Sequence, residues 1–248
     1  MRYLGYKVKT VMNITDIDDK TIRDSQKSGK SLQEFTKFYA NEFLQDLDRL
    51  SINRADTIAP ISTLIDDMGI MIQGLIQNVR INNDEYEKDQ VADFALWKSY
   101  DRESDGPNKW TIVISIDGKD ITLDGRPGWH IECSACNHHF FGDQIDIHMG
   151  GIDNLFPHHQ NEVAQTEAFT GKQFAKYWMH GGHLLVDNKK MAKSAGNFYT
   201  LRDISEKNKD IPEVLIARGF RLMALQNQYR ENFNFTFERL QAAINTIK

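Results

Sequence analysis

The apolar positions of residues 32–50 repeat with the period of an α-helix. Ser31 and Glu34 have the spacing of a capping box, which marks the start of a helix. The residues that follow at intervals of four are aromatic or aliphatic: Phe35, Tyr39, Phe43 and Leu47. This pattern predicts a helix from about Leu32 to Leu50. The apolar residues from Ile61 to Val79 predict a second amphipathic helix after Pro60, and Asn82-Asn83-Asp84 would end it.

Short β-branched segments alternate with these helices. Lys7–Ile14 predicts a strand, and Thr15–Lys20 a turn from that strand into a helix. The apolar residues on both sides of Asp117-Gly118 are typical of a β-hairpin. Alternation of strands and helices indicates an α/β core.

The second half of the chain continues with a strand and several helices. Gln144–Met149 predicts a buried strand that ends in Gly150-Gly151, and Pro157 is well placed to open a helix to about Phe169. Further helices are expected from Pro212 and from Phe237. The last forty residues are therefore expected to be mostly helical.

Composition and charge narrow the class of protein. Of the 248 residues, 40% are hydrophobic and 26% are charged, which argues against a disordered, collagenous or disulfide-scaffold protein. A net charge of −5 lowers the expectation of a free-standing nucleic-acid binder, although an enzyme can still meet nucleic acid through a local patch. No apolar run approaches the roughly 18 residues that span a bilayer, and Met1–Lys7 lacks the apolar region of a secretory signal. We expect a cytoplasmic protein that does not enter a membrane.

One set of side chains has the chemistry of a metal site. His158 and Glu162 are four residues apart on a predicted helix and share one face. With Cys133 they would supply three good zinc ligands and leave one position open. A solvated ion pair between His158 and Glu162, and a core position for Cys133, are the alternatives.

Cys133 and Cys136 are the only two cysteines and have a C-x-x-C spacing. Without a secretory signal, a thiol redox pair or a metal site is favoured over a structural disulfide. The histidines that follow favour a metal site. Cys136 would be either a further ligand or a core residue, and we favour the core position because the helix after Cys133 should point Cys136 elsewhere.

Three further segments are candidates for nucleotide chemistry. The loop Lys190–Asn197 carries two lysines that can neutralise a polyphosphate, and a solvated basic loop is its alternative. Gly150-Gly151 after a strand, with Asp153 close by, suits a nucleotide and its ribose, or else forms a plain tight turn. The aspartates of residues 16–19 suggest Mg²⁺, although aspartates are also ordinary at a helix start.

Taken in order, several blocks of this sequence resemble the cysteinyl-tRNA synthetases, a family of class I aminoacyl-tRNA synthetases. The blocks that carry the resemblance are Asn13–Lys20, Asp93–Lys98, Gly125–Ala135, Gly150–Glu162, Tyr177–His180 and Lys190–Asn197. They span nearly the whole chain, and Gly125–Ala135 and Gly150–Glu162 are the most specific of them.

The resemblance implies a fold and an activity. It implies a Rossmann-like α/β catalytic core over residues 1–200, with a shortened insertion, and over 201–248 the helical stem-contact region and start of the tRNA-binding domain. The implied activity is ATP-dependent activation of cysteine, with Mg²⁺ and a catalytic Zn²⁺, and its transfer to tRNA(Cys).

The resemblance also assigns residues to roles. Cys133, His158 and Glu162 match three of the family's four zinc ligands. Thr15, Trp129 and His148 match the cysteine pocket. The implied ATP site is made of Gly150, Gly151, Asp153 and Lys193, with Lys190 and Lys193 as the catalytic lysines of the mobile loop.

The sequence also departs from the family pattern. The family's first strand, which carries the fourth zinc ligand and a His-Ile-Gly-His motif, has no counterpart before Met1. Ala192 replaces a serine of the lysine loop and Gln160 replaces a glutamate. An α/β sheet without its first strand is expected to keep an exposed edge or to be reordered. The departures leave two alternatives to a truncated cysteine–tRNA ligase core: a cysteine ligase of the mycothiol pathway type, and a catalytically dead zinc-binding remnant.

Overall fold

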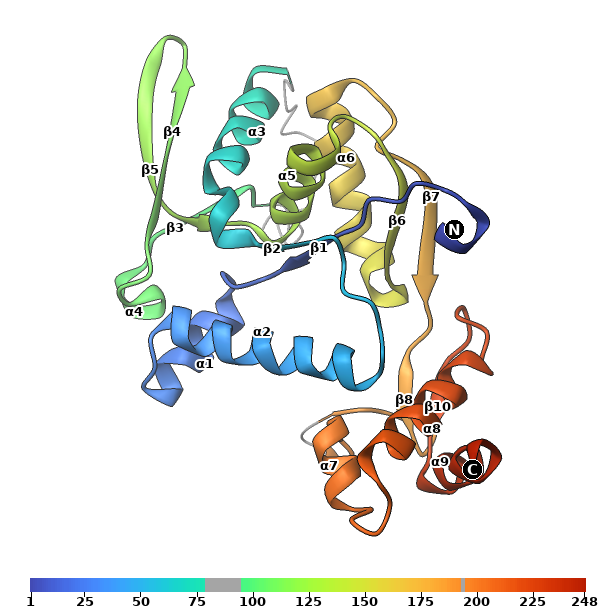
Figure 1. Ribbon diagram of the computed structural model, residues 1–248. Helices are drawn as coiled ribbons and strands as arrows, with labels where there is room; N and C mark the ends of the chain where they lie inside the picture. Colours follow the sequence, from blue (N-terminus) through green and yellow to red (C-terminus); the bar gives the residue numbers. More distant parts are fainter. Residues whose placement is uncertain (79–94, 193–194) are drawn as a thin grey trace. The chain divides into compact units, whose positions relative to one another are not determined.

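A computed structural model of the chain describes residues 1–78, 95–192 and 195–248 (Figure 1). Val79, Asn82–Asp84, Asp93 and Lys193, which the sequence analysis singled out, lie outside the described residues. The chain forms two compact units that interleave along the sequence. Unit 1 comprises residues 1–41, 55–148 and 156–177, and unit 2 comprises 42–54, 149–155 and 178–248. These units follow spatial contacts, and the functional division at residue 200 stays a prediction.

The first half of the chain alternates strands and helices as expected. Its elements are a 3₁₀ turn at Arg2–Leu4, β1 Val11–Ile14, α1 Asp19–Ser28, α2 Leu32–Arg49, β2 Thr57–Pro60, a 3₁₀ turn at Ile61–Leu64, α3 Ile65–Asn78, β3 Trp97–Ser99, α4 Arg102–Asp105, β4 Trp110–Ile116, β5 Lys119–Pro127 and α5 Trp129–Phe141. The predicted order of strand, turn and helix is confirmed, although β1 begins at Val11 and not at Lys7, and Asp18 caps α1 by accepting from the backbone N–H of Thr21.

The second half contains β6 Ile145–Gly151, a 3₁₀ turn at Ile152–Asn154, a π-type turn at Leu155–His159, α6 Gln160–Thr170, β7 Ala175–Gly181, β8 Leu184–Val186, β9 Lys189–Lys190, α7 Leu201–Glu206, α8 Glu213–Leu225, β10 Phe233–Phe235 and α9 Phe237–Ile247. The helices expected after Pro212 and from Phe237 are confirmed as α8 and α9.

Local sequence signals explain where several elements begin and turn. The Glu34 carboxylate accepts from the backbone N–H of Ser31 at 3.1 Å, and the Ser31 hydroxyl accepts from the backbone N–H of Glu34 at 3.2 Å, as a capping box requires. Asp117 and Gly118 have φ angles of 52° and 75°. Positive φ at both central residues defines the tight hairpin turn that matches the twist of β4 and β5.

The α/β class is confirmed, but the sheet is divided. Among the described residues β1 pairs in parallel with β2, while β6 pairs with β7 in a separate sheet. Two other sheets have the strand orders β3-β5-β4 and β10-β8-β9. In the two-stranded sheets β1–β2 and β6–β7 both strands therefore lack a second neighbour among the described residues.

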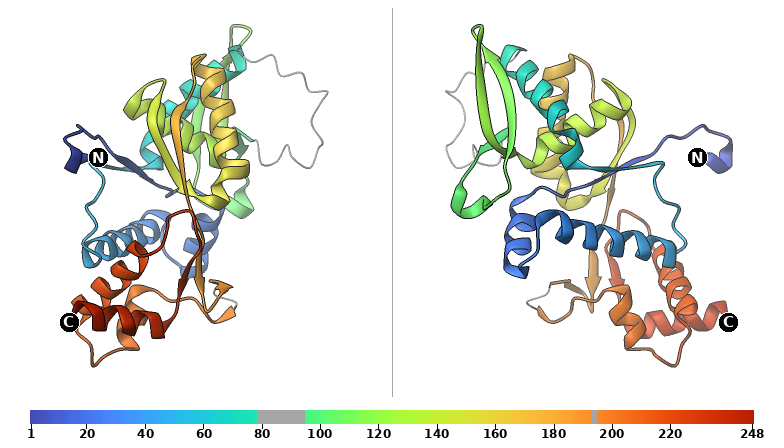
Figure 2. Two further views of the ribbon diagram at one scale, coloured as in Figure 1. Left: turned by 90° about the vertical axis from the view of Figure 1, so that its right-hand side faces the viewer. Right: turned by 60° about the vertical axis from the view of Figure 1, so that its left-hand side comes forward.

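Helices α3, α5 and α6 pack together to form the core of unit 1, as Figures 1 and 2 show. The buried core residues there are mainly aliphatic and sulfur-containing, and they include Ile61, Met68, Ile72, Ile131 and Cys136. The face of α3 also packs on strand β4 of the hairpin. This packing fixes α5 and α6 against each other, and these two helices carry the candidate metal ligands.

Three local expectations need correction. Pro157 lies in the π-type turn, and the regular helix α6 begins only at Gln160. Strand β6 has a single buried residue, Ile145, so it is not the buried strand that its apolar sequence predicted. Helix α2 has nearly the predicted bounds. Its aromatic residues Tyr39 and Phe43 are exposed, however, and Leu32 is the only buried residue of this helix.

Unit 2 has its own core, in which α8 and α9 pack together around Ile216, Met223, Leu240 and Ile244. Gly219 allows this close approach, since a Cβ there would lie 2.6 Å from the Ile244 side chain. Across all described residues, no helix is both long and apolar enough to cross a membrane.

Candidate metal and active site

Helix α5 positions one candidate ligand. It begins directly after β5, and Gly128 at its N-cap donates a backbone hydrogen bond of 2.9 Å to Leu96 O. A side chain at Gly128 would not fit, because a Cβ would lie 1.6 Å from the carbonyl oxygen of Ala95. From this fixed start, Trp129 and Cys133 follow four residues apart, on one face of α5.

Helix α6 and the turn before it position the other two candidate ligands. His158 lies in the π-type turn, and Glu162 lies in the first turn of α6. Both residues are buried, and Glu162 has no exposed surface. One ligand atom each of Cys133, His158 and Glu162 lies within 4.8 Å of the others. The three predicted metal ligands are therefore together, which the solvated-pair alternative does not account for.

The carboxylate of Glu162 faces two histidines. Oε1 lies 3.0 Å from His158 Nε2, and Oε2 lies 3.0 Å from His148 Nε2. Burial alone raises the pKa of Glu162, but the two imidazoles outweigh it and hold this pKa at about 2. Glu162 is therefore an ionised carboxylate inside the protein.

The unsatisfied carboxylate oxygens of Glu162 also indicate a metal site. Although both histidine nitrogens are close, neither carboxylate oxygen of Glu162 has a hydrogen-bond partner of good geometry among the described residues. A fully buried carboxylate without well-aligned donors is costly unless a cation compensates its charge. Thiolate, imidazole and carboxylate together are the donor set that zinc prefers. The residues present therefore fit a zinc ion.

The thiol of Cys133 can bind a metal ion only after it loses its proton. Desolvation, followed by the nearby carboxylates of Glu162 and Glu132, raises its pKa well above the ordinary value. A thiol whose pKa is raised in this way is a poor nucleophile, because only the thiolate reacts. Desolvation also raises the pKa of Cys136, to about 12. These two shifts argue against a thiol redox pair.

Cys136 lies outside the group of close ligand atoms. It is 4% exposed and belongs to the apolar core of unit 1. It is not among the residues that the structure gathers around Glu162. This placement agrees with the preference for a core position over a further zinc ligand.

Two residues matched to the cysteine pocket lie beside the ligands. The indole of Trp129 stacks on the imidazole of His158, with ring centroids 4.4 Å apart, while Trp129 stays 48% exposed. His148 contacts the other oxygen of Glu162. The third matched residue, Thr15, directly follows β1 and is half-buried. Trp129 and His148 are thus gathered at the ligand group by direct contacts, while Thr15 comes from another element.

The sequence analysis missed two buried histidines at this site. His130 Nδ1 lies 2.9 Å from His158 Nδ1, and His159 forms with His148 and Glu162 a second group of close ligand atoms. Both residues are 4% exposed or less. Their only signal in the sequence was adjacency to Trp129 and His158.

The residues matched to the ATP site belong to unit 2. Gly150 and Gly151 end β6, and Asp153 lies in the exposed 3₁₀ turn that follows. A Cβ at Gly151 would lie 2.4 Å from Asp153 Oδ1. Gly151 thus lets the Asp153 carboxylate fold over the backbone.

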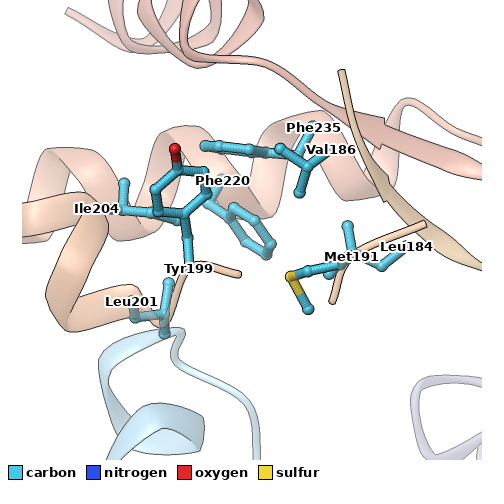
Figure 3. Close-up of a pocket in the computed structure, with 8 residues that line it drawn as sticks. All are labelled: Leu184, Val186, Met191, Tyr199, Leu201, Ile204, Phe220 and Phe235. Atoms are coloured by element: carbon cyan, nitrogen blue, oxygen red, sulfur yellow. The ribbon is translucent and has the colours of Figure 1, made fainter. Parts of the chain in front are cut away.

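Two hydrogen bonds of the Asn197 side chain stabilise the described part of the lysine loop. The amide of Asn197 donates to the carbonyl oxygen of Lys190, and its side-chain oxygen accepts from the N–H of Ala192 at 2.9 Å. Met191 enters an apolar pocket whose lining is drawn in Figure 3: Leu184, Val186, Tyr199, Leu201, Ile204, Phe220 and Phe235. With Met191 anchored in this way, Lys190 remains exposed on β9.

The family comparison matches almost the whole chain. Residues 1–80 and 76–245 match the family of tRNA synthetases class I (C), catalytic domain. The chain is 40% identical to the cysteine–tRNA ligase of Protochlamydia amoebophila over 285 aligned residues, covering 100% of this chain and 57% of that protein. It is 43% identical to the cysteine–tRNA ligase of Chlamydia muridarum over 99% of this chain and 56% of that protein. The chain thus spans a little more than half the length of these curated relatives.

Solved structures with a similar fold are also synthetases. Two structures of Mycobacterium tuberculosis methionyl-tRNA synthetase with methionyl-adenylate align with TM-scores of 0.59 and 0.62, covering 99% of this chain and 62% of theirs. Their sequence identities of 12% and 13% show a shared fold only. From the family match over nearly all of its residues, and from relatives about 40% identical along its full length, the chain belongs to the class I (C) family of tRNA synthetase catalytic domains.

Proposed function

We propose that this chain is the catalytic core of a cysteine–tRNA ligase, which activates cysteine with ATP and delivers it to tRNA(Cys) in the longer protein. The observation that carries the proposal is the close grouping of Cys133 with the buried residues His158 and Glu162, beside Trp129. A cysteine–tRNA ligase core is favoured over a mycothiol-type ligase because the two relatives described above are named cysteine–tRNA ligases.

In this proposal Cys133, His158 and Glu162 hold a zinc ion with one position left for the thiol of the substrate. Bound zinc would supply a soft Lewis acid, which prefers a thiolate to the hydroxyl of serine. A site that satisfies its own bonding only with the correct substrate can discriminate strongly without an editing step. Trp129, which covers the imidazole of His158, would shield the bound thiol from water.

The protein's part in activation is binding and orientation. The carboxylate oxygen of cysteine attacks the α-phosphate of ATP, and the bond to the pyrophosphate leaving group breaks. Lys190 and Lys193 would stabilise the charge that develops on pyrophosphate, and Mg²⁺ would accompany the nucleotide. Gly150 and Gly151 allow the nucleotide close to the backbone, and Asp153 would bind ribose hydroxyls.

A lysine pair tests the ATP site. A hydrogen bond to a charged group is worth about 1.5–3 kcal/mol, so Lys193→Ala should weaken ATP binding roughly tenfold or more. Lys172→Ala is the matched control, because Lys172 is an exposed lysine whose Nζ pairs with Asp143 at 2.7 Å. Equilibrium binding of ATP is the measurement. Equal effects of the two substitutions would remove Lys193 from the ATP site.

A further inference from the structure

His130 is a buried histidine for which the proposed chemistry has no role. It lies in the first turn of α5, three residues before Cys133, and is 1% exposed. Its Nδ1 lies 2.9 Å from Nδ1 of His158, the neighbouring candidate ligand. The two ring centroids are 5.0 Å apart at an interplanar angle of 46°.

The distance between the two Nδ1 atoms constrains their protons. At 2.9 Å they form a hydrogen bond, so one nitrogen donates and the other accepts. A neutral imidazole carries a single proton, on either Nδ1 or Nε2. The proton on one ring therefore decides which nitrogen of the other ring has a lone pair.

The other nitrogen of His158 faces the ligand group. Nε2 of His158 lies 3.0 Å from Oε1 of Glu162. While Nε2 carries the proton it has no lone pair for a metal ion, and Nδ1 of His158 accepts from Nδ1–H of His130. To bind a metal ion, Nε2 must present its lone pair, so the proton of His158 has to be on Nδ1.

We propose that His130 is a positioning residue for the metal site: as the acceptor in the Nδ1–Nδ1 hydrogen bond it stabilises the tautomer and ring orientation in which His158 can ligate a metal ion. The inference rests on the proposed function, because it concerns the ion that Cys133, His158 and Glu162 would hold. In the metal-bound state Nδ1–H of His158 donates to Nδ1 of His130, whose own proton is then on Nε2. Each ring keeps one proton, so the exchange of tautomers leaves both imidazoles neutral.

The arrangement follows a general rule for metal sites. A ligating histidine usually bonds through its second nitrogen to a partner that fixes its tautomer and orientation. His148 plays the corresponding part on the other side, since it contacts the oxygen of Glu162 that does not face His158. Both ligands from the α6 region are thus held by histidines outside the proposed ligand set.

The test compares three substitutions in the full chain by competition between the protein and a chromophoric zinc chelator. Loss of such a supporting partner typically costs 10–100-fold in metal affinity, so His130→Leu should weaken zinc binding by about tenfold or more. His130→Asn places an amide atom where Nδ1 stands and can accept the same hydrogen bond, so it should restore most of this affinity. His139→Leu is the control on the same helix, because His139 is exposed and pairs with Asp67 at 2.8 Å.

The outcomes separate this inference from the proposal beneath it. If His130→Leu and His130→Asn lost zinc affinity equally, His130 would act only through packing. This result would overturn the inference even if the wild type bound zinc with normal affinity. A wild type that binds no zinc would overturn the metal site together with the inference. Thermal unfolding of the zinc-free variants shows whether each one folds.

A spectroscopic readout tests the tautomers directly. Long-range ¹⁵N–¹H correlation spectra of the wild type should show His158 protonated on Nε2 without zinc and on Nδ1 with zinc. His130 should show the opposite change. An unchanged His130 tautomer on zinc binding would contradict the proposal.

Discussion

Cys133→Ser is expected to weaken zinc binding by about 100-fold, the largest effect of any single side chain at the site. The free energy of zinc binding to structural sites with four protein ligands is roughly 10–16 kcal/mol, so a single protein ligand is worth about 3 kcal/mol. Serine keeps the size of cysteine but lacks the soft sulfur that zinc prefers. The measurement is competition with a chelator of known affinity.

Cys136→Ser is the matched control for this experiment. Cys136 lies one helical turn further along α5 and is buried in the apolar core. The substitution Cys136→Ser should therefore lower the stability somewhat and leave the zinc affinity nearly unchanged. A loss of zinc with Cys136→Ser as large as that with Cys133→Ser would mean that both cysteines bind the ion and that the site is closed.

Gly128→Ala is expected to lower the free energy of unfolding by roughly 4 kcal/mol, at the upper end of single substitutions. A Cβ at this position would lie 1.6 Å from the carbonyl oxygen of Ala95, and the backbone has to move to make room. The movement would displace the start of α5, which carries Trp129, His130 and Cys133. Urea unfolding followed by circular dichroism measures the change.

Gly69→Ala provides the control for a glycine with room for a side chain. The nearest atom to a Cβ at Gly69, Ile112 Cγ2, is 3.4 Å away, an ordinary contact. Alanine is favoured over glycine inside a helix by about 1 kcal/mol, so stability should stay the same or rise. If Gly128→Ala proved as mild as Gly69→Ala, the close approach at Ala95 would not fix the start of α5.

Local signals in the sequence predicted the elements well, because each depends on neighbouring residues only. The capping box at Ser31 and Glu34 and the Asp117-Gly118 turn occur as their residue types require. The pairing of strands that are distant along the chain was harder to predict from the sequence. Nothing in the local sequence of β1 and β6 shows that they lie in different sheets.

The candidate site was predictable in its ligands but not in their surroundings. Glu162 and His158 were indicated by their spacing, Cys133 was grouped with them as a good zinc ligand, and the resemblance to a family supported the whole set. The role of His130 depends on a contact between α5 and the turn before α6, 28 residues apart in the chain. Similarly, the apolar periodicity of α2 predicted the helix correctly. The exposure of its aromatic side chains, however, depends on which elements pack against the helix.

In the proposed function, the metal site keeps an open position that takes the thiol of cysteine. The most direct test replaces zinc with Co²⁺ in the full chain and follows the absorption band that arises from charge transfer between thiolate and metal. Cysteine should strengthen this band by adding a second thiolate to that of Cys133, whereas serine at the same concentration should leave it unchanged. A spectrum that responds to neither amino acid, or equally to both, would contradict the account.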